Sequence, residues 1–192
     1  MKIGVLAAQG AFAEHIDKLR QLGVETMPVR LPGELEGLDG LVIPGGESTS
    51  ISKLLLAYKM ADKIRILAGS GLPILGTCAG TILLAKKNSD GYPEPLGVMD
   101  MTVKRNAFGR QKESFETELS VPALGEKPFH GVFIRAPLIE KVADDVEILA
   151  RLDNGTIVAA RQGKILALAF HPELTDDLRF HQYFLNIITG RQ

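Results

Sequence analysis

The sequence contains one cysteine and no long apolar run. A single cysteine cannot form a disulfide within the chain, which excludes a secreted disulfide scaffold and is typical of a reducing compartment. No apolar stretch approaches the ~18 residues that cross a membrane. The apolar run at residues 3–8 stops at Gln9 and is shorter than the ~7–15-residue core of a signal peptide. We therefore expect a cytoplasmic protein without a membrane segment.

The chain also lacks an excess of either charge. It has 22 Lys and Arg against 23 Asp and Glu, a formal net charge of −1. This balance argues against a nucleic-acid-binding protein and against a polybasic membrane-surface protein. There is no cysteine pair and no His-Glu-x-x-His, so no metal is expected, and no motif calls for a cofactor. The length of 192 residues favours one domain covering 1–192.

The first half of the chain alternates short apolar runs with segments of helical periodicity. Expected strands cover residues 2–8, 24–29, 40–43 and 72–75, and expected helices cover residues 12–22, 48–58, 61–68 and 79–87. Alternating strands and helices predict a parallel sheet with helices on both faces.

The second half is rich in strands without intervening helices. Expected strands cover residues 98–103, 115–121, 129–134, 146–152, 156–161 and 164–170. Asp153-Asn154-Gly155 is typical of a hairpin turn. A final helix is expected at residues 175–189, with Thr175 as N-cap and Gly190 at its end. The predicted fold is a three-layer α/β domain, flavodoxin-like, with a mostly parallel central sheet and an antiparallel extension.

The most informative motif is Gly76-Thr77-Cys78-Ala79-Gly80, between an expected strand and an expected helix. It has the form of a nucleophile elbow, in which a tight turn exposes the central side chain and the flanking glycines avoid collision. A helix N-terminus also favours a thiolate. A buried structural cysteine is the alternative, and this context disfavours it. We expect Cys78 to be a nucleophile.

A nucleophilic cysteine needs a base, and His171 directly follows an expected strand. Functional groups gather at the carboxyl ends of parallel strands, so His171 and Cys78 are expected to meet there. Glu173 can orient the imidazole and stabilise its cation. Of the other histidines, His15 is expected to be solvated or partner-facing, and His130 and His181 are expected to be structural.

The segment Pro44-Gly45-Gly46-Glu47-Ser48 follows another expected strand. Glycines let backbone N–H groups approach a ligand closely, as the oxyanion hole of acyl transfer requires, and the N–H groups of Glu47 and Ser48 can bind a carboxylate. An ordinary turn with Ser48 as helix cap is the alternative. The spacing of a phosphate-binding P-loop is missing.

Together these blocks resemble the class I (triad) glutamine amidotransferases. Six blocks are closer still to the PdxT family, the glutaminase subunits of pyridoxal 5′-phosphate synthase. They are GVLAAQGAFAEH at 4–15, PGGESTS at 44–50, GTCAG at 76–80, RNAFGRQ at 105–111, FIRAP at 133–137 and FHPEL at 170–174. The combination is specific and spans essentially the whole chain, whereas the elbow alone also occurs in other amidotransferases and some hydrolases.

The resemblance implies hydrolysis of L-glutamine to L-glutamate and ammonia. It assigns Cys78 as the nucleophile that forms a glutamyl thioester, His171 as base and acid, and Glu173 as its partner. Backbone groups of Gly46 and Ala79 are implied for the oxyanion hole. The implied glutamine contacts are Gly46, Glu47, Ser48, Arg105, Ile134 and Arg135. A guanidinium can fork onto a carboxylate, although without the resemblance both arginines would be surface side chains.

The resemblance also implies a partner. The ammonia would pass to a PdxS-type synthase subunit, whose oligomeric core carries the glutaminase subunits and builds pyridoxal 5′-phosphate from a pentose phosphate and glyceraldehyde 3-phosphate. Docking would activate a weak free glutaminase, with Gln9-Gly10 in the contact. Two alternatives stay open: the glutaminase subunit of another triad amidotransferase, such as imidazole glycerol phosphate synthase, and a redox-sensing protein with its cysteine on the same elbow.

Overall fold

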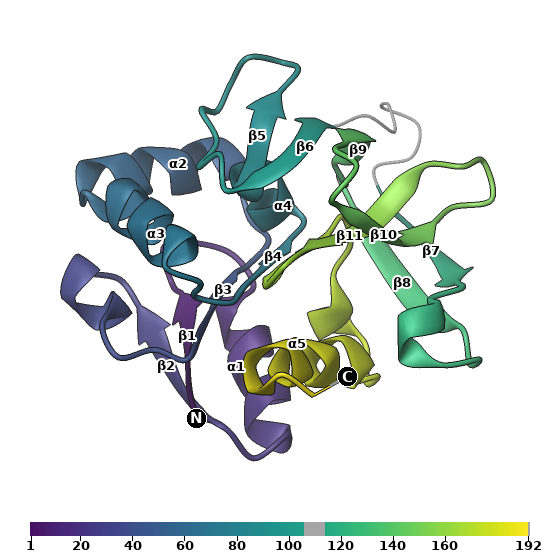
Figure 1. The fold of residues 1–192 in the computed structure, drawn as a ribbon, viewed down its shortest axis with the longest axis horizontal. Coiled ribbons are helices and arrows are strands. Elements are labelled where there is room, and N and C mark those ends of the chain that lie inside the picture. Colours follow the sequence, from purple (N-terminus) through teal and green to yellow (C-terminus); the bar gives the residue numbers. More distant parts are fainter. Residues whose placement is uncertain (106–113, 192) are drawn as a thin grey trace.

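The computed structural model describes residues 1–105 and 114–191, and its central feature is a ten-stranded sheet (Figure 1). Five strands are parallel, in the order β2-β1-β3-β4-β12. Their bounds are β1 Lys2–Leu6, β2 Glu25–Val29, β3 Gly40–Ile43, β4 Ile74–Thr77 and β12 Ile165–Leu168. The predicted parallel sheet is confirmed.

The sheet continues beyond β12 in the order β11-β9-β6-β5, with β10 paired to β11. Three of these junctions are antiparallel, β12 to β11, β11 to β9 and β9 to β6, so the predicted antiparallel extension is also present. The bounds are β5 Ala85–Asn88, β6 Met99–Lys104, β9 Leu138–Val142, β10 Glu147–Arg151 and β11 Ile157–Gln162. A separate hairpin pairs β7 (Ser114–Leu119) with β8 (Phe129–Ile134).

Helices cover both faces of the parallel strands. On one face α2 (Ser48–Ala57), α3 (Met60–Gly69) and α4 (Ala79–Leu84) pack on one apolar cluster. On the other, α1 (Phe12–Gln21) and α5 (Arg179–Thr189) pack on a second, and Figure 1 shows them side by side. Along β3, β4 and β12 the buried residues alternate between the two clusters, which explains why these central strands are largely apolar.

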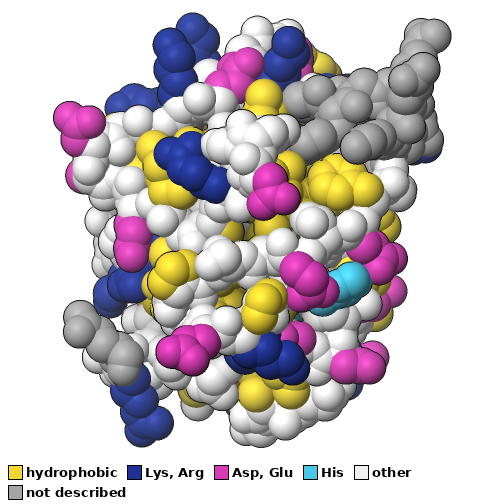
Figure 2. Space-filling view, turned by 90° about the vertical axis from the view of Figure 1, so that its right-hand side faces the viewer, with side chains coloured by type: hydrophobic (Ala, Val, Ile, Leu, Met, Phe, Trp, Pro, Cys, Tyr) yellow, Lys and Arg dark blue, Asp and Glu magenta, His cyan; other side chains and the backbone are white. Residues whose placement is uncertain are grey.

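Three short 3₁₀ helices complete the described elements. They are η1 (Pro32–Leu35), η2 (Pro122–Leu124) and η3 (Pro172–Leu174). No helix within residues 1–105 and 114–191 combines the length and apolarity needed to span a bilayer. On the face drawn in Figure 2, positive and negative side chains are interspersed.

Three sequence-based element predictions need correction. The helix expected at 79–87 ends at Leu84, because the chain then pairs in parallel with β6 as β5, whose exposed Lys86 and Lys87 lie between buried Ala85 and Asn88. Strand β9 was not predicted, since its Glu140 and Lys141 break the apolar pattern.

The last helix begins at Arg179 rather than at residue 175. Thr175 does not cap it: the Thr175 hydroxyl accepts the N–H of Asp177, and the Asp177 carboxylate accepts the N–H of Arg179. These two successive turns delay the helix. Gly190 ends it in the left-handed conformation, as predicted (φ 68°).

The order of the parallel strands determines where a site can lie. From β1 the chain passes to β2 on one side, and the next strand, β3, lies on the other side of β1. This reversal opens a crevice beyond the carboxyl ends of β1 and β3, where flavodoxin-like folds bind ligands.

The core of the α1/α5 face supplies the first testable prediction. Phe180 is fully buried, with its ring centroid 4.7 Å from that of Phe129 and 5.3 Å from that of Phe170. Phe180→Ala should lower the free energy of unfolding by about 3–5 kcal/mol, measured by urea denaturation. The control Ile66→Ala, at a 68% exposed position, should change it by no more than about 0.5 kcal/mol. Equal losses in both variants would contradict this packing.

Candidate active site

A cavity of about 530 Å³ lies at the predicted edge of the sheet, where the segments after β1, β3, β4 and β12 converge. Nine of the ten residues that the sequence predicts for substrate binding or catalysis line this cavity. Its lining consists of Gln9, Gly46, Glu47, Ser48, Cys78, Ala79, Ile82, Arg105, Ser114, Ile134, Arg135 and His171. Glu173 lies behind His171. The structure therefore brings every predicted site residue together.

Cys78 occupies the strained turn that the elbow motif predicts. Its backbone has φ 48° and ψ −105°, a conformation that costs about 1–3 kcal/mol for a residue other than glycine. Gly80 makes the turn possible, because a Cβ there would lie 1.9 Å from the carbonyl oxygen of Ile43. The Cys78 sulfur is 3.5 Å from the carbonyl oxygen of Ile134, to which it can donate.

His171 lies between Cys78 and Glu173. Its Nδ1 is 2.7 Å from Glu173 Oε1, and its backbone N–H donates to Val132 across 2.9 Å. Burial alone would lower the pKa of His171, but hydrogen bonds to Cys78 and Glu173 and their negative charges raise it to about 10. The arrangement thus favours an imidazolium beside the Cys78 sulfur, a group suited to attack on a carbonyl carbon.

Gly45 packs directly against this pair. A Cβ at Gly45 would lie 2.5 Å from His171 Cε1 and 3.3 Å from the Cβ of Cys78. A side chain here would displace the imidazole, so the glycine loop after β3 is required for close packing. The loop is also tied to the N-terminal segment, because Ala11 N–H donates to the Gly45 carbonyl across 3.2 Å.

Glu173 is almost completely buried, at 2% exposure. Burial opposes its charge, but the neighbouring His15 and His171 together lower the pKa of its carboxyl. The group is therefore a carboxylate at neutral pH, as a partner for an imidazolium must be.

Sequence reasoning was wrong about His15. It was expected to be solvated or partner-facing, but it is fully buried, with Nε2 3.3 Å from Glu173 Oε2. The helical spacing contained the signal, since position 15 falls on the apolar face that Phe12 and Leu19 define. His181 is buried too, whereas His130 is half-exposed between Glu116 and Glu118.

The start of α2 differs from the alternative in which Ser48 caps the helix. Glu47 is the N-cap, and its carboxylate accepts the N–H groups of Thr49 and Ser50, at 3.0 and 2.8 Å. Burial would raise the pKa of Glu47, but these hydrogen bonds lower it, so the group stays charged. The cavity therefore has a fixed negative charge at one side.

Two arginines supply positive charge. Arg105 donates to the Thr49 hydroxyl across 3.1 Å and to the Tyr92 carbonyl across 3.2 Å. Arg135 has a positive φ of 45° and lines the same cavity. The rest of the 105–111 block, residues 106–111, lies outside the described residues. Among residues 1–105 and 114–191, no cluster of three His, Cys, Asp or Glu side chains could hold a metal ion.

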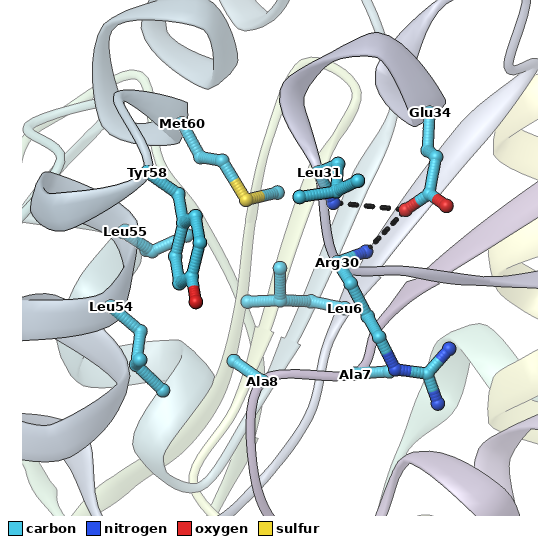
Figure 3. A pocket seen from close by; sticks show the side chains of 10 residues that line it. All are labelled: Leu6, Ala7, Ala8, Arg30, Leu31, Glu34, Leu54, Leu55, Tyr58 and Met60. Carbon is cyan, nitrogen blue, oxygen red and sulfur yellow. Dashed lines mark hydrogen bonds between the residues drawn. The ribbon is translucent and has the colours of Figure 1, made fainter.

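A second cavity, of about 390 Å³, lies beside the ends of β1 and β2 (Figure 3). Leu6, Leu55 and Met60 make it largely apolar, and Tyr58 stands at its side. Its Glu34 carboxylate is occupied by the backbone N–H groups of Arg30 and Leu31. None of its lining side chains belongs to the predicted catalytic set.

Comparison with known proteins places these features in a family. The chain is 60% identical over 190 residues to the pyridoxal 5′-phosphate synthase subunit PdxT of Herpetosiphon aurantiacus, covering 97% of this chain and 100% of that protein. It is 54% identical over 188 residues to the PdxT subunit of Moorella thermoacetica, covering 98% of this chain and all of that protein.

The fold comparison agrees. A crystal structure described as a glutamine amidotransferase superposes with a TM-score of 0.91 at 52% identity, covering 97% of this chain and 98% of the other. Residues 5–189 match the sequence pattern of one family across nearly the whole chain. The chain belongs to the SNO glutamine amidotransferase family.

Proposed function

We propose that this chain is the glutaminase subunit of a pyridoxal 5′-phosphate synthase, a glutamine amidohydrolase that supplies ammonia for vitamin B6 biosynthesis. One observation supports the chemistry. Cys78, on a strained elbow, shares a cavity with His171, whose Nδ1 is hydrogen-bonded to the buried carboxylate of Glu173. The PdxT relatives, at 60% and 54% identity over nearly the whole chain, support the pathway.

In this mechanism the Cys78 thiolate attacks the side-chain amide carbon of L-glutamine. As the C–N bond breaks, His171 gives its proton to the leaving nitrogen, which departs as ammonia and leaves a glutamyl thioester. Water then attacks the thioester and passes a proton to His171, and glutamate leaves as the C–S bond breaks. Glu173 keeps the imidazole oriented and offsets its positive charge.

The oxyanion of each tetrahedral intermediate would be held by backbone N–H groups of Gly46 and Ala79, which line the same cavity as Cys78. The α-amino acid end of glutamine is a zwitterion and needs charges of both signs. Arg105 and Arg135 suit its carboxylate, and Glu47 suits its ammonium. Ser48 and Ile134 complete the substrate contacts that we assign.

The partner is a PdxS-type synthase subunit that consumes the ammonia. We propose that it contacts the exposed segment Gln9-Gly10, because this segment is packed onto the site: a Cβ at Gly10 would lie 1.8 Å from the Gly45 oxygen, and Gly45 touches His171 and Cys78. Free ammonia escapes into solvent, so docking over the cavity would retain it. We place the complex in the cytoplasm, where a reduced Cys78 persists.

The proposal is tested first by measuring glutamate release from L-glutamine, by the chain alone and after mixing with a PdxS-type subunit. A low rate that rises on mixing is expected, because the partner would contact Gln9-Gly10, which packs against Gly45 beside the catalytic pair. A high rate without response to the partner would assign the chain to another amidotransferase branch. No turnover in either mixture would revive the redox-sensor alternative.

Removal of the nucleophile gives a sharper prediction. Cys78→Ala should lower glutamate release in the complex by at least about a thousandfold, since no thioester can form. Binding to the synthase subunit, measured by gel filtration, should be unchanged. The matched control His130→Gln, at a half-exposed histidine outside the cavity, should retain wild-type turnover. Retained turnover in Cys78→Ala would disprove the covalent mechanism.

The raised pKa of His171 predicts a pH-dependent stability. Because the folded-state pKa of about 10 exceeds the unfolded value near 6.5, the folded chain binds a proton more tightly. The resulting stabilisation is complete below about pH 6.5 and is lost as the pH rises towards about 10.

Urea denaturation should therefore show that the stability difference between wild type and His171→Gln shrinks over this range. A difference that stays constant with pH would mean that His171 is not held as a cation.

A further inference from the structure

Four buried polar side chains, one of them Glu173 of the proposed triad, form a cluster, and each comes from a different element. They are His15 on α1, Thr77 at the end of β4, Glu173 in η3 and His181 on α5. His15 Nε2 is 3.1 Å from Thr77 Oγ1 and 3.3 Å from Glu173 Oε2, and His15 Nδ1 is 2.9 Å from His181 Nε2. Only Glu173 has a part in the mechanism above, so the other three need an explanation.

Both histidines of this cluster are neutral. Burial is the main reason that the pKa of His15 is lowered; His171 lowers it further, while Glu173 and Glu14 oppose the shift. Burial, with His15 and Lys18, holds the pKa of His181 well below its usual value. Each ring therefore has one N–H and one lone pair, and their placement is decided by their neighbours.

Two arrangements of protons satisfy the contact between the two rings. If His15 carried its proton on Nδ1, its Nε2 lone pair would face the Glu173 carboxylate, and the N–H of His181 Nδ1 would be buried without an acceptor. If His15 carries its proton on Nε2, that N–H donates to Thr77 Oγ1 and lies beside Glu173 Oε2, and His181 Nε2–H donates to His15 Nδ1. Of the ring nitrogens of His15 and His181, the second arrangement leaves only the lone pair of His181 Nδ1 without a partner among the described residues.

Glu173 needs such a neighbour. Its Oε1 is bonded to His171, but Oε2 is buried and forms no hydrogen bond with the residues that the structure describes. His15 Nε2 is the polar atom placed within ion-pair distance of Oε2. An N–H dipole directed at this oxygen stabilises the carboxylate and opposes rotation about the bond that carries it.

We propose that His15 is a positioning residue for glutamine hydrolysis: its Nε2–H holds the second oxygen of Glu173, and His181 fixes the His15 tautomer that provides this N–H. The proposal rests on the proposed function. It adds His15 on α1 and His181 on α5 to the residues that keep His171 oriented. His15 does not touch the cavity, so it acts through Glu173.

The test compares two replacements of His15 in the complex with the synthase subunit. His15→Leu removes the N–H, whereas His15→Gln retains an N–H donor of similar reach. We expect His15→Leu to lower kcat by roughly ten- to a hundredfold, the loss typical of leaving a buried charged group without a polar partner, with KM for glutamine unchanged. His15→Gln should recover most of the activity, and the control His130→Gln should match wild type.

The pH profile separates positioning from a purely structural effect. Without the N–H, the Glu173 carboxylate is less stable, so the acid limb of kcat/KM should move to higher pH in His15→Leu and stay in place in His15→Gln. The charged and titratable groups around the cluster are His171, Glu14 and Lys18, and all remain in both variants. Wild-type kcat and an unmoved acid limb in His15→Leu would overturn the proposal.

A measurement on the unmodified chain keeps the proposal testable if His15→Leu does not fold. ¹⁵N NMR of the histidine rings, assigned with His15→Gln, should show His15 neutral and protonated on Nε2 at neutral pH. A cation or the Nδ1–H tautomer would overturn it. If wild type turns over no glutamine, the proposed function fails separately, and the NMR result still decides the proton arrangement.

Discussion

The buried charge of Glu173 is the constraint on which the site depends. A carboxylate at 2% exposure is unstable unless its surroundings replace the lost water. His171 provides one hydrogen bond, at 2.7 Å, and the same contact raises the pKa of the imidazole. The buried anion thus keeps the imidazole next to Cys78 protonated. The stability of the site and its chemistry have the same electrostatic origin.

Close backbone packing is the second requirement, because the charged groups must meet at one point. Three glycines lie so close to a neighbouring segment that a Cβ would collide with it. The neighbours are the carbonyl of Ile43 for Gly80, the carbonyl of Gly45 for Gly10, and the His171 ring for Gly45. These contacts join the segments that follow β1, β3, β4 and β12. The flavodoxin-like strand order brings those segments to one edge, and the glycines bring them into contact.

Much of this site could be predicted from the sequence, for a physical reason. The elbow around Cys78 and the His-x-Glu segment are local patterns, in which each residue type is required by its immediate neighbours. The prediction failed where distant contacts decide the outcome. Residues 85–88 continue a helical pattern but pair with β6, and β9 is stabilised by neighbours on both sides despite its polar residues. A single sequence does not contain those pairings.

His15 illustrates the same limit at the site. The helical spacing places His15 on the apolar face of α1, but only the packing of α1 beside α5 brings it next to His181. Replacing both rings by apolar side chains would remove two costly buried polar groups and would favour the core by that measure. It would also remove the His15 Nε2 atom that lies 3.3 Å from Glu173 Oε2. The cost of burying two histidines is therefore offset by the stability of the carboxylate, which connects the helical layer of the fold to the cavity at the sheet edge.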